Sequence, residues 1–206
     1  MNKKVMFSIM LLCCALGCAH RLEIHQLPPG SEDFLPSEVG VVIPAILKAV
    51  EVRVNGSDIN PDPEFVRLVL GKLRRTYIFS EVNRAEDVSK MKMREKAVRL
   101  RLLVDSEVNT HETANLVKFA ATCASLFLLS PVLSLTDDFD ATITLKAIRH
   151  DGEEKYYTSR MRGINHYSIF ITSQSRREVR TEVTQRTLNS LMRQLMKDSD
   201  FFAMKE

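Results

Sequence analysis

The chain has 206 residues, of which 45% are hydrophobic and 27% charged, and its 29 basic and 26 acidic side chains give a formal net charge of +3. This length is enough for one domain with a hydrophobic core of its own. A charge balance so close to neutral provides no bulk electrostatic attraction to nucleic acid, so a DNA-binding or RNA-binding protein is not expected.

The first residues have the organisation of a bacterial export signal. Lys3 and Lys4 supply positive charge, an apolar run extends from Val5 to Leu16, and a small residue, Gly17, follows. The apolar run is shorter than the roughly 20 residues that a helix needs to cross a bilayer. We therefore expect residues 1–17 to be a signal peptide. Without Lys3 and Lys4, the basic and acidic counts become nearly equal.

Ala15-Leu16-Gly17-Cys18 resembles the lipobox of bacterial lipoproteins. The resemblance implies that the Cys18 thiol receives a diacylglycerol, that the chain is cut before Cys18, and that the freed amine takes a further acyl chain, such as palmitate. Each buried methylene contributes about 0.8 kcal/mol, so several chains anchor a protein that one chain would hold only marginally. Ordinary secretion or an uncleaved anchor are the alternatives.

The residue after the lipobox cysteine bears on the location. Ala19 stands where Asp would favour retention at the inner membrane in Gram-negative lipoproteins. The resemblance thus implies a lipid-anchored protein on the periplasmic face of the outer membrane. Cleavage would leave only Cys18 and Cys123. Acylation of Cys18 would then exclude an internal disulfide, so stability must come from the core.

Residues 18–45 are predicted to be a semi-extended tether, because prolines and a glycine interrupt any regular element. Hydrophobic and charged residues then alternate over Val50–Val54, which predicts a half-buried strand that ends at Asn55-Gly56. The next element is an amphipathic helix that begins at Pro63, with Asp62 as its capping residue.

Three more strands are predicted by alternation, over residues 97–108, 139–146 and 154–162, and Asp151-Gly152 is a strong hairpin turn between the last two. A capping box from Ser175 to Glu178 predicts the start of a closing helix. The order predicts one α+β domain over residues 46–206, in which an antiparallel sheet of about four strands packs on two amphipathic helices.

An apolar insertion, residues 116–135, interrupts this pattern. It carries no charge after Lys118, but Pro131 divides it. Three interpretations are open: a buried helix or hairpin, an element that touches lipid or a partner protein, and a spanning segment. Large exposed apolar patches usually mark interaction sites. The candidate contact residues are Phe119, Phe127, Leu128, Leu129 and Val132.

Catalytic chemistry has little support in the sequence. His111-Glu112 begins like the H-E-x-x-H zinc motif, but Asn115 occupies the position of the second histidine. Asp137, Asp138 and Asp140 lack the spacing of a calcium loop and are expected to form a solvated entrance to a strand. We therefore expect no metal, no cofactor and no enzymatic activity. The alternative is a hydrolase or ligand-binding protein with a site near His111, Asp138 and His150.

An α+β domain behind a lipobox loosely resembles the small periplasmic lipoproteins that assist lipopolysaccharide assembly or ABC transport. The resemblance implies a non-catalytic accessory or assembly factor of an envelope or transport complex. Its partners would be the lipid bilayer, through the acyl chains on Cys18, and an envelope protein. Insertion of residues 116–135 into the membrane is the remaining alternative.

Overall fold

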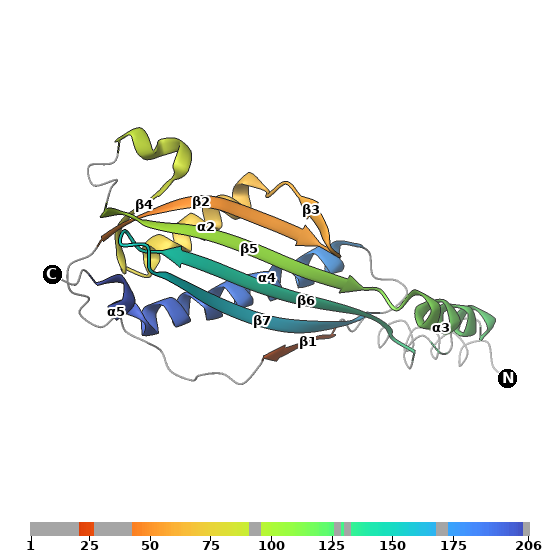
Figure 1. Ribbon diagram of the computed structural model, residues 1–206. Helices are drawn as coiled ribbons and strands as arrows, with labels where there is room; N and C mark the ends of the chain where they lie inside the picture. The colour runs from red at the N-terminus through yellow and green to blue at the C-terminus, as the bar shows by residue number, and fades with distance from the viewer. Residues whose placement is uncertain are drawn as a thin grey trace. The chain divides into compact units, whose positions relative to one another are not determined.

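The computed structural model describes residues 21–26, 43–90, 96–125, 129, 133–167 and 173–203 (Figure 1). The strands are β1 (Arg21–Gln26), β2 (Ile43–Val54), β3 (Ser57–Ile59), β4 (Phe79–Arg84), β5 (Val98–Asn109), β6 (Leu135–Ile148) and β7 (Glu154–Tyr167). The helices are α2 (Pro63–Arg75), the 3-10 helix η1 (Ala85–Lys90), α3 (Glu112–Ala124), α4 (Ser173–Lys197) and α5 (Ser199–Phe202).

The strands form one seven-stranded sheet in the order β1-β7-β6-β5-β2-β3, with β4 also paired to β2. The prediction of about four antiparallel strands was therefore wrong in number and in direction, although the α+β class is confirmed. β2 runs parallel to both β4 and β5 and antiparallel only to β3. The parallel pairing with β4 follows from α2, because a helix between two strands returns the chain to the starting edge.

The chain divides into two units. Unit 1 comprises residues 1–25, 108–140 and 162–183, and unit 2 comprises residues 26–107, 141–161 and 184–206. The strands β1, β5, β6 and β7 and the helix α4 contribute residues to both units.

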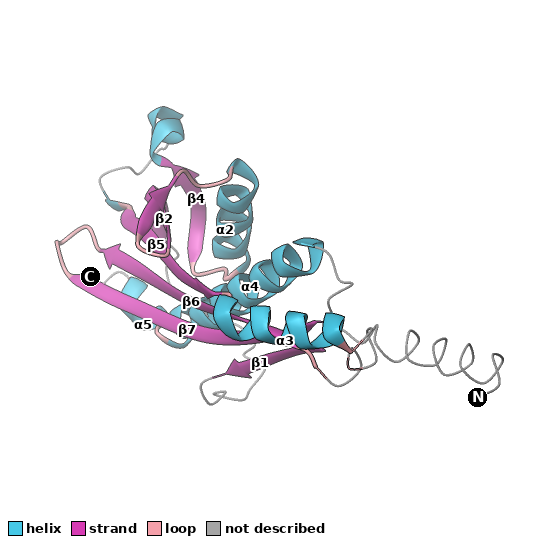
Figure 2. Ribbon diagram, turned by 90° about the vertical axis from the view of Figure 1, so that its right-hand side faces the viewer, coloured by secondary structure: helices cyan, strands magenta, loops and turns pink. Residues whose placement is uncertain are grey.

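Unit 2 contains the main hydrophobic core. One face of its strands packs on α2 and on the second half of α4, and Figure 2 shows α2 beside β2 and β4. Leu100, Leu102, Ile143 and Leu145 contribute from β5 and β6, each with essentially no exposed surface. The opposite face is polar: alternate residues of β5 and β7, including Arg99, are exposed. This alternation is typical of a sheet that is covered on one side.

The helix α2 begins as its sequence predicts. The Asp62 side chain accepts a hydrogen bond of 2.9 Å from the backbone N–H of Glu64, and Pro63 occupies the first turn, where its missing donor costs nothing. Val66, Val69 and Leu73 are buried against the sheet. The amphipathic pattern therefore identified both the helix and its buried face.

The closing helix starts earlier than expected. α4 begins at Ser173, so Ser175 lies within the helix and the predicted capping box does not mark its first residue. The chain then ends in α5, whose Phe202 is 1% exposed and meets Phe79 edge to face, with ring centroids 5.2 Å apart. Phe202 therefore belongs to the core of unit 2.

Unit 1 begins with a strand that the sequence analysis placed in the tether. β1 occupies Arg21–Gln26, where Leu22 and Ile24 alternate with polar residues. Its first residue comes three positions after Cys18, which itself lies outside the described residues. The remaining parts of unit 1 are the end of β5, α3, the start of β6, the end of β7 and the first half of α4.

Candidate functional site

The helix α3 lies between β5 and β6 and its polarity is inverted. It begins at Glu112, four residues before the predicted apolar insertion, and overlaps the first part of that insertion. Its buried residues are polar, Asn115 and Thr122. Its exposed residues are largely apolar: Leu116 is 66% exposed, Val117 64% and Phe119 47%. A helix on a soluble protein normally buries its apolar stripe and exposes its polar one. We call the exposed apolar side of this helix, which includes Leu116, Val117, Phe119, Ala120 and Ala124, the α3 apolar face.

Hydrogen bonds explain why the polar side faces inward. The Asn115 amide donates to the carbonyl oxygens of Thr110 and Thr136, the latter at 2.9 Å, and accepts from the backbone N–H of Thr136 at 3.0 Å. Lys118 Nζ donates to the carbonyl oxygen of Ser134 at 2.9 Å. Asn115 thus binds the start of β6 much as a neighbouring strand would. Turning the helix over would leave these backbone groups without partners.

The predicted contact residues are only partly within the described chain. Phe119 and Leu129 are exposed by 47% and 40%, respectively. Phe127, Leu128 and Val132 lie outside the residues whose side chains are described. Contact with lipid or protein at these five positions stays a prediction, as does lipidation of Cys18. Among the described residues, no helix has the length and apolarity required to cross a membrane.

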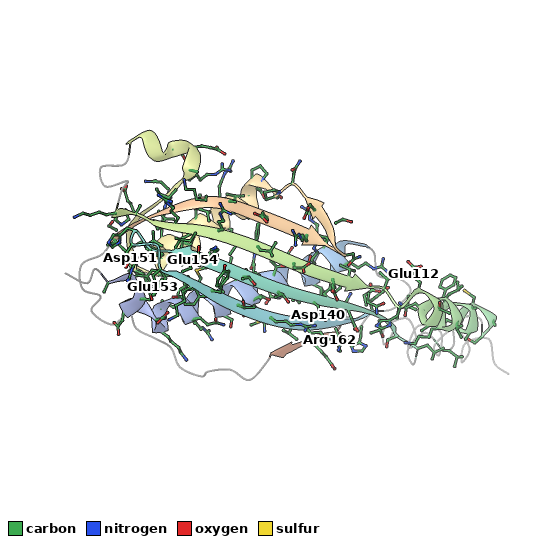
Figure 3. The ribbon with its side chains drawn as sticks, in the orientation of Figure 1. Glu112, Asp140, Asp151, Glu153, Glu154 and Arg162 are labelled. Carbon is green, nitrogen blue, oxygen red and sulfur yellow. The ribbon has the colours of Figure 1, made fainter. Side chains whose placement is uncertain are left out.

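Two of the three residues in the predicted hydrolase site meet in unit 1. His111 Nε2 lies 3.1 Å from Asp138 Oδ2, and Arg162 Nη2 donates a hydrogen bond to the same carboxylate oxygen. Figure 3 shows Arg162 on β7 beside Asp140 on β6. His111 has a left-handed backbone, with φ of 45°, and its backbone N–H donates a hydrogen bond of 3.0 Å to Asn109 Oδ1. The turn before α3 therefore places the imidazole against Asp138.

His150 does not join them. It belongs to unit 2, in the exposed turn that follows the end of β6, whereas Asp138 stands near the start of that strand. In this turn Arg149 pairs with Asp151 and with Glu153, and Gly152 adopts φ of 91° (Figure 3). The Asp151-Gly152 pair is thus explained by the turn and its ion pairs.

A second carboxylate is buried beside the first. Asp137 has no exposed surface, Arg176 Nε lies 2.7 Å from its Oδ2, and the Tyr167 hydroxyl donates to its Oδ1 at 3.2 Å. Burial raises the pKa of Asp137, and Arg176 partly opposes this rise. The expectation of a solvated strand entrance was wrong for Asp137 and Asp138, because arginines from β7 and α4 cover both carboxylates.

The environment of Asp138 acts in the other direction. Burial alone would raise its pKa, but hydrogen bonds from Arg162 and His111 outweigh burial, so the pKa of Asp138 is lowered. A lowered pKa stabilises the fold above the ordinary value of about 4, and this stabilisation disappears as the pH falls through the lowered pKa. Among the described residues, no three His, Cys, Asp or Glu side chains gather into a group that could hold a metal.

We expect Asp138→Asn to lower the free energy of unfolding by about 1 kcal/mol at pH 7, because the charged hydrogen bonds to Arg162 and His111 are weakened. The difference from the wild type should shrink as the pH falls through the lowered pKa of Asp138, because the wild-type carboxylate then becomes neutral as well. Urea unfolding at pH 7 and at about pH 2 measures it. Asp87→Asn, the same change at an exposed carboxylate of η1, is the control. An equal loss at both pH values would contradict the charge-based explanation.

Comparisons with known proteins give distant structural neighbours. A rare lipoprotein B from Shewanella oneidensis is 13% identical, with a TM-score of 0.41, over 74% of this chain and 96% of its own. A PelC dodecamer from Paraburkholderia phytofirmans is 11% identical, with a TM-score of 0.29, over 84% of this chain and 99% of its own. No known family and no curated protein matches the sequence.

Proposed function

We propose that this protein is a lipid-anchored, non-catalytic accessory factor of an envelope assembly or transport complex. Its anchor would be the acylated Cys18, on the periplasmic face of the outer membrane. The observation that carries the proposal is the start of β1 at Arg21, three residues after Cys18. Three residues span at most about 10 Å, so acyl chains on Cys18 would hold unit 1 close to the membrane.

The side chains of unit 1 support a binding role rather than a catalytic one. The conspicuous ionic groups are paired with one another: Asp138 with Arg162 and His111, and Asp137 with Arg176 and Tyr167, although Asp137 Oδ2 makes an ion pair without a hydrogen bond. Groups paired in this way hold β6, β7, α3 and α4 together. The α3 apolar face and the open polar face of the sheet in unit 2 are then the surfaces available for interaction.

Replacing Cys18 by Ser tests the anchor. We expect the wild type to carry a lipid mass and to fractionate with the outer membrane, and Cys18→Ser to lose both, because the acyl chains supply most of the membrane affinity. Intact mass and density fractionation measure the two properties. Cys123→Ser, the same change at the cysteine of α3, should alter neither. A variant at Cys18 with unchanged mass and location would overturn the proposed anchor.

The accessory role needs its own test. Deletion of the gene should produce an envelope or transport defect, and the wild type should restore it. A photo-crosslinker at Tyr156, which is 59% exposed on the open face of the sheet, should join one envelope protein. If deletion leaves envelope and transport phenotypes intact and no partner is crosslinked, the accessory role is wrong even where the protein is acylated.

A hydrolase or ligand-binding protein is the second candidate, and the contact between His111 and Asp138 is the observation that favours it. A hydrolytic role requires His111 to act as a proton acceptor held by Asp138. His111→Gln should then abolish hydrolysis of ester and peptide substrates, and His166→Gln, the same change on β7, should not. We expect no hydrolysis by the wild type, because Arg162 and His111 both contact Asp138 and these contacts serve to hold the fold together.

A further inference from the structure

We propose that the α3 apolar face lies in the headgroup region of the same membrane that holds the acyl chains of Cys18, as a second, non-covalent lipid contact. This inference rests on the proposed function, since it requires the anchor. It assigns a lipid surface, and not a protein, to the exposed side of α3.

The chemistry of the face suits lipid. Leu116, Val117 and Phe119 are roughly half to two-thirds exposed, and the small residues Ala120 and Ala124 are exposed between them. The one lysine of the helix, Lys118, is half-buried and donates a hydrogen bond to the carbonyl oxygen of Ser134. Polar exposed side chains occur only at the start of the helix, at Glu112 and Thr113. Protein interfaces, in contrast, combine apolar anchors with hydrogen-bonding groups and arginines, which this face lacks.

The position of the anchor points to the same occupant. Cys18 stands three residues before β1, and residues 21–25 of this strand belong to the same unit as α3. Figure 1 shows β1 running away from α3, so that the strand starts at its end nearer to the helix. With three residues spanning at most about 10 Å, the acyl chains would enter the bilayer on the side of unit 1 that carries α3.

The helix can lie on the membrane but cannot cross it. Its 13 residues extend about 20 Å, less than the hydrocarbon thickness of about 30 Å. Its polar side is tied to Thr110, Ser134 and Thr136 by hydrogen bonds, so only the apolar side is free to meet lipid. An amphipathic helix in this situation lies in the interface, with its apolar side about 5–10 Å deep.

The test uses the acylated protein, cut before Cys18 and otherwise intact, in vesicles of phosphatidylethanolamine and phosphatidylglycerol. In a Cys123→Ser background, single cysteines replace either Phe119 or Ile59 and carry an environment-sensitive fluorophore. Ile59 is the matched control, because it is an apolar residue of β3 in unit 2 with 49% exposure, against 47% for Phe119. Lipids brominated near the headgroup end of their acyl chains quench a probe that touches the bilayer.

We expect the probe at position 119 to shift to shorter wavelength and to be quenched, and the probe at 59 to change little. Adding Leu116→Glu and Val117→Glu should lower the ratio of docked to undocked helix by about tenfold or more, because two apolar side chains that would be buried in the lipid are lost. Quenching at 119 would then fall to the level seen at 59.

Two outcomes overturn the inference and leave the anchor standing. The first is an unquenched probe at 119 on protein that floats with the vesicles. The second is a photo-crosslinker at 119 that joins a protein in cells in place of lipid. If the protein lacks a lipid mass and does not float, the proposed anchor at Cys18 is wrong. The lipid contact of α3, which requires that anchor, is then wrong as well.

Discussion

Arg176→Met is expected to lower the free energy of unfolding by about 2 kcal/mol at pH 7. The substitution leaves the fully buried carboxylate of Asp137 without its cationic partner. Removal of one member of a fully buried pair costs about 3–5 kcal/mol, and we expect less because the Arg176 side chain is itself 45% exposed. Urea unfolding measures the change. Arg177→Met, at the exposed neighbouring position on α4, should change stability by less than about 0.5 kcal/mol.

The pH dependence identifies the cause. Burial raises the pKa of Asp137, so the folded state favours the neutral carboxyl. The unfavourable effect of charging it is absent below about pH 4 and grows as the pH rises through the raised pKa. Arg176→Met should therefore approach the stability of Arg177→Met near pH 4 and fall below it at pH 7. The double variant with Asp137→Asn should regain most of the loss at pH 7. Equal stability of the two arginine variants at pH 7 would contradict this account.

Phe202→Ala is expected to have the larger effect, a loss of about 3–5 kcal/mol, because it empties a large site in the core of unit 2. The ring is 1% exposed and contacts Phe79, Tyr157 and Phe201. Its position is held by Asp198, which accepts a hydrogen bond from Tyr157 and pairs with Lys155 at 2.6 Å. Thermal and urea unfolding measure the loss.

The control for Phe202 is the same substitution at an exposed position. Phe119→Ala removes a ring that is 47% exposed on the α3 apolar face. In the absence of membranes, it should change the free energy of unfolding by less than about 0.5 kcal/mol. Phe202→Leu should lose less than half as much stability as Phe202→Ala, since the leucine side chain fills most of the site. A Phe202→Ala variant as stable as Phe119→Ala would show that the C-terminal residues do not pack on the core.

The sheet shows why local patterns were an incomplete guide. Strands with clean alternation were located by the sequence: β5 lies close to its predicted bounds, whereas β6 begins earlier than predicted, at Leu135, and β7 ends later, at Tyr167. β4 was missed because its burial does not alternate, and its parallel partner β2 lies more than 20 residues earlier in the chain. β1 does alternate, at Leu22 and Ile24, but the prolines that follow led to its assignment as tether. Pairing between distant segments leaves no mark in a short window of sequence.

The candidate site was predictable only in its composition. The apolar insertion was visible as a run of uncharged residues, but its sequence alone permitted a buried, a docked and a spanning helix. The arrangement was decided by Asn115, whose amide binds Thr110 and Thr136 and so turns the polar side inward. The sequence offered a site near His111, Asp138 and His150 as an alternative, and only His111 and Asp138 meet in the structure. Arg162 and Arg176 were not connected to the aspartates.

The sequence by itself determined the features that depend on neighbouring residues: the lipobox pattern at Cys18, the start of α2 at Pro63, the hairpin turn at Asp151-Gly152 and the α+β class. Capping, turn geometry and alternation act over a few residues, so a short stretch contains all the information. Only the tertiary structure decided which face of α3 is exposed and that Asp137 and Asp138 are buried. These properties depend on partners that the fold brings from β7, α4 and the end of β5, and burial is defined by such partners.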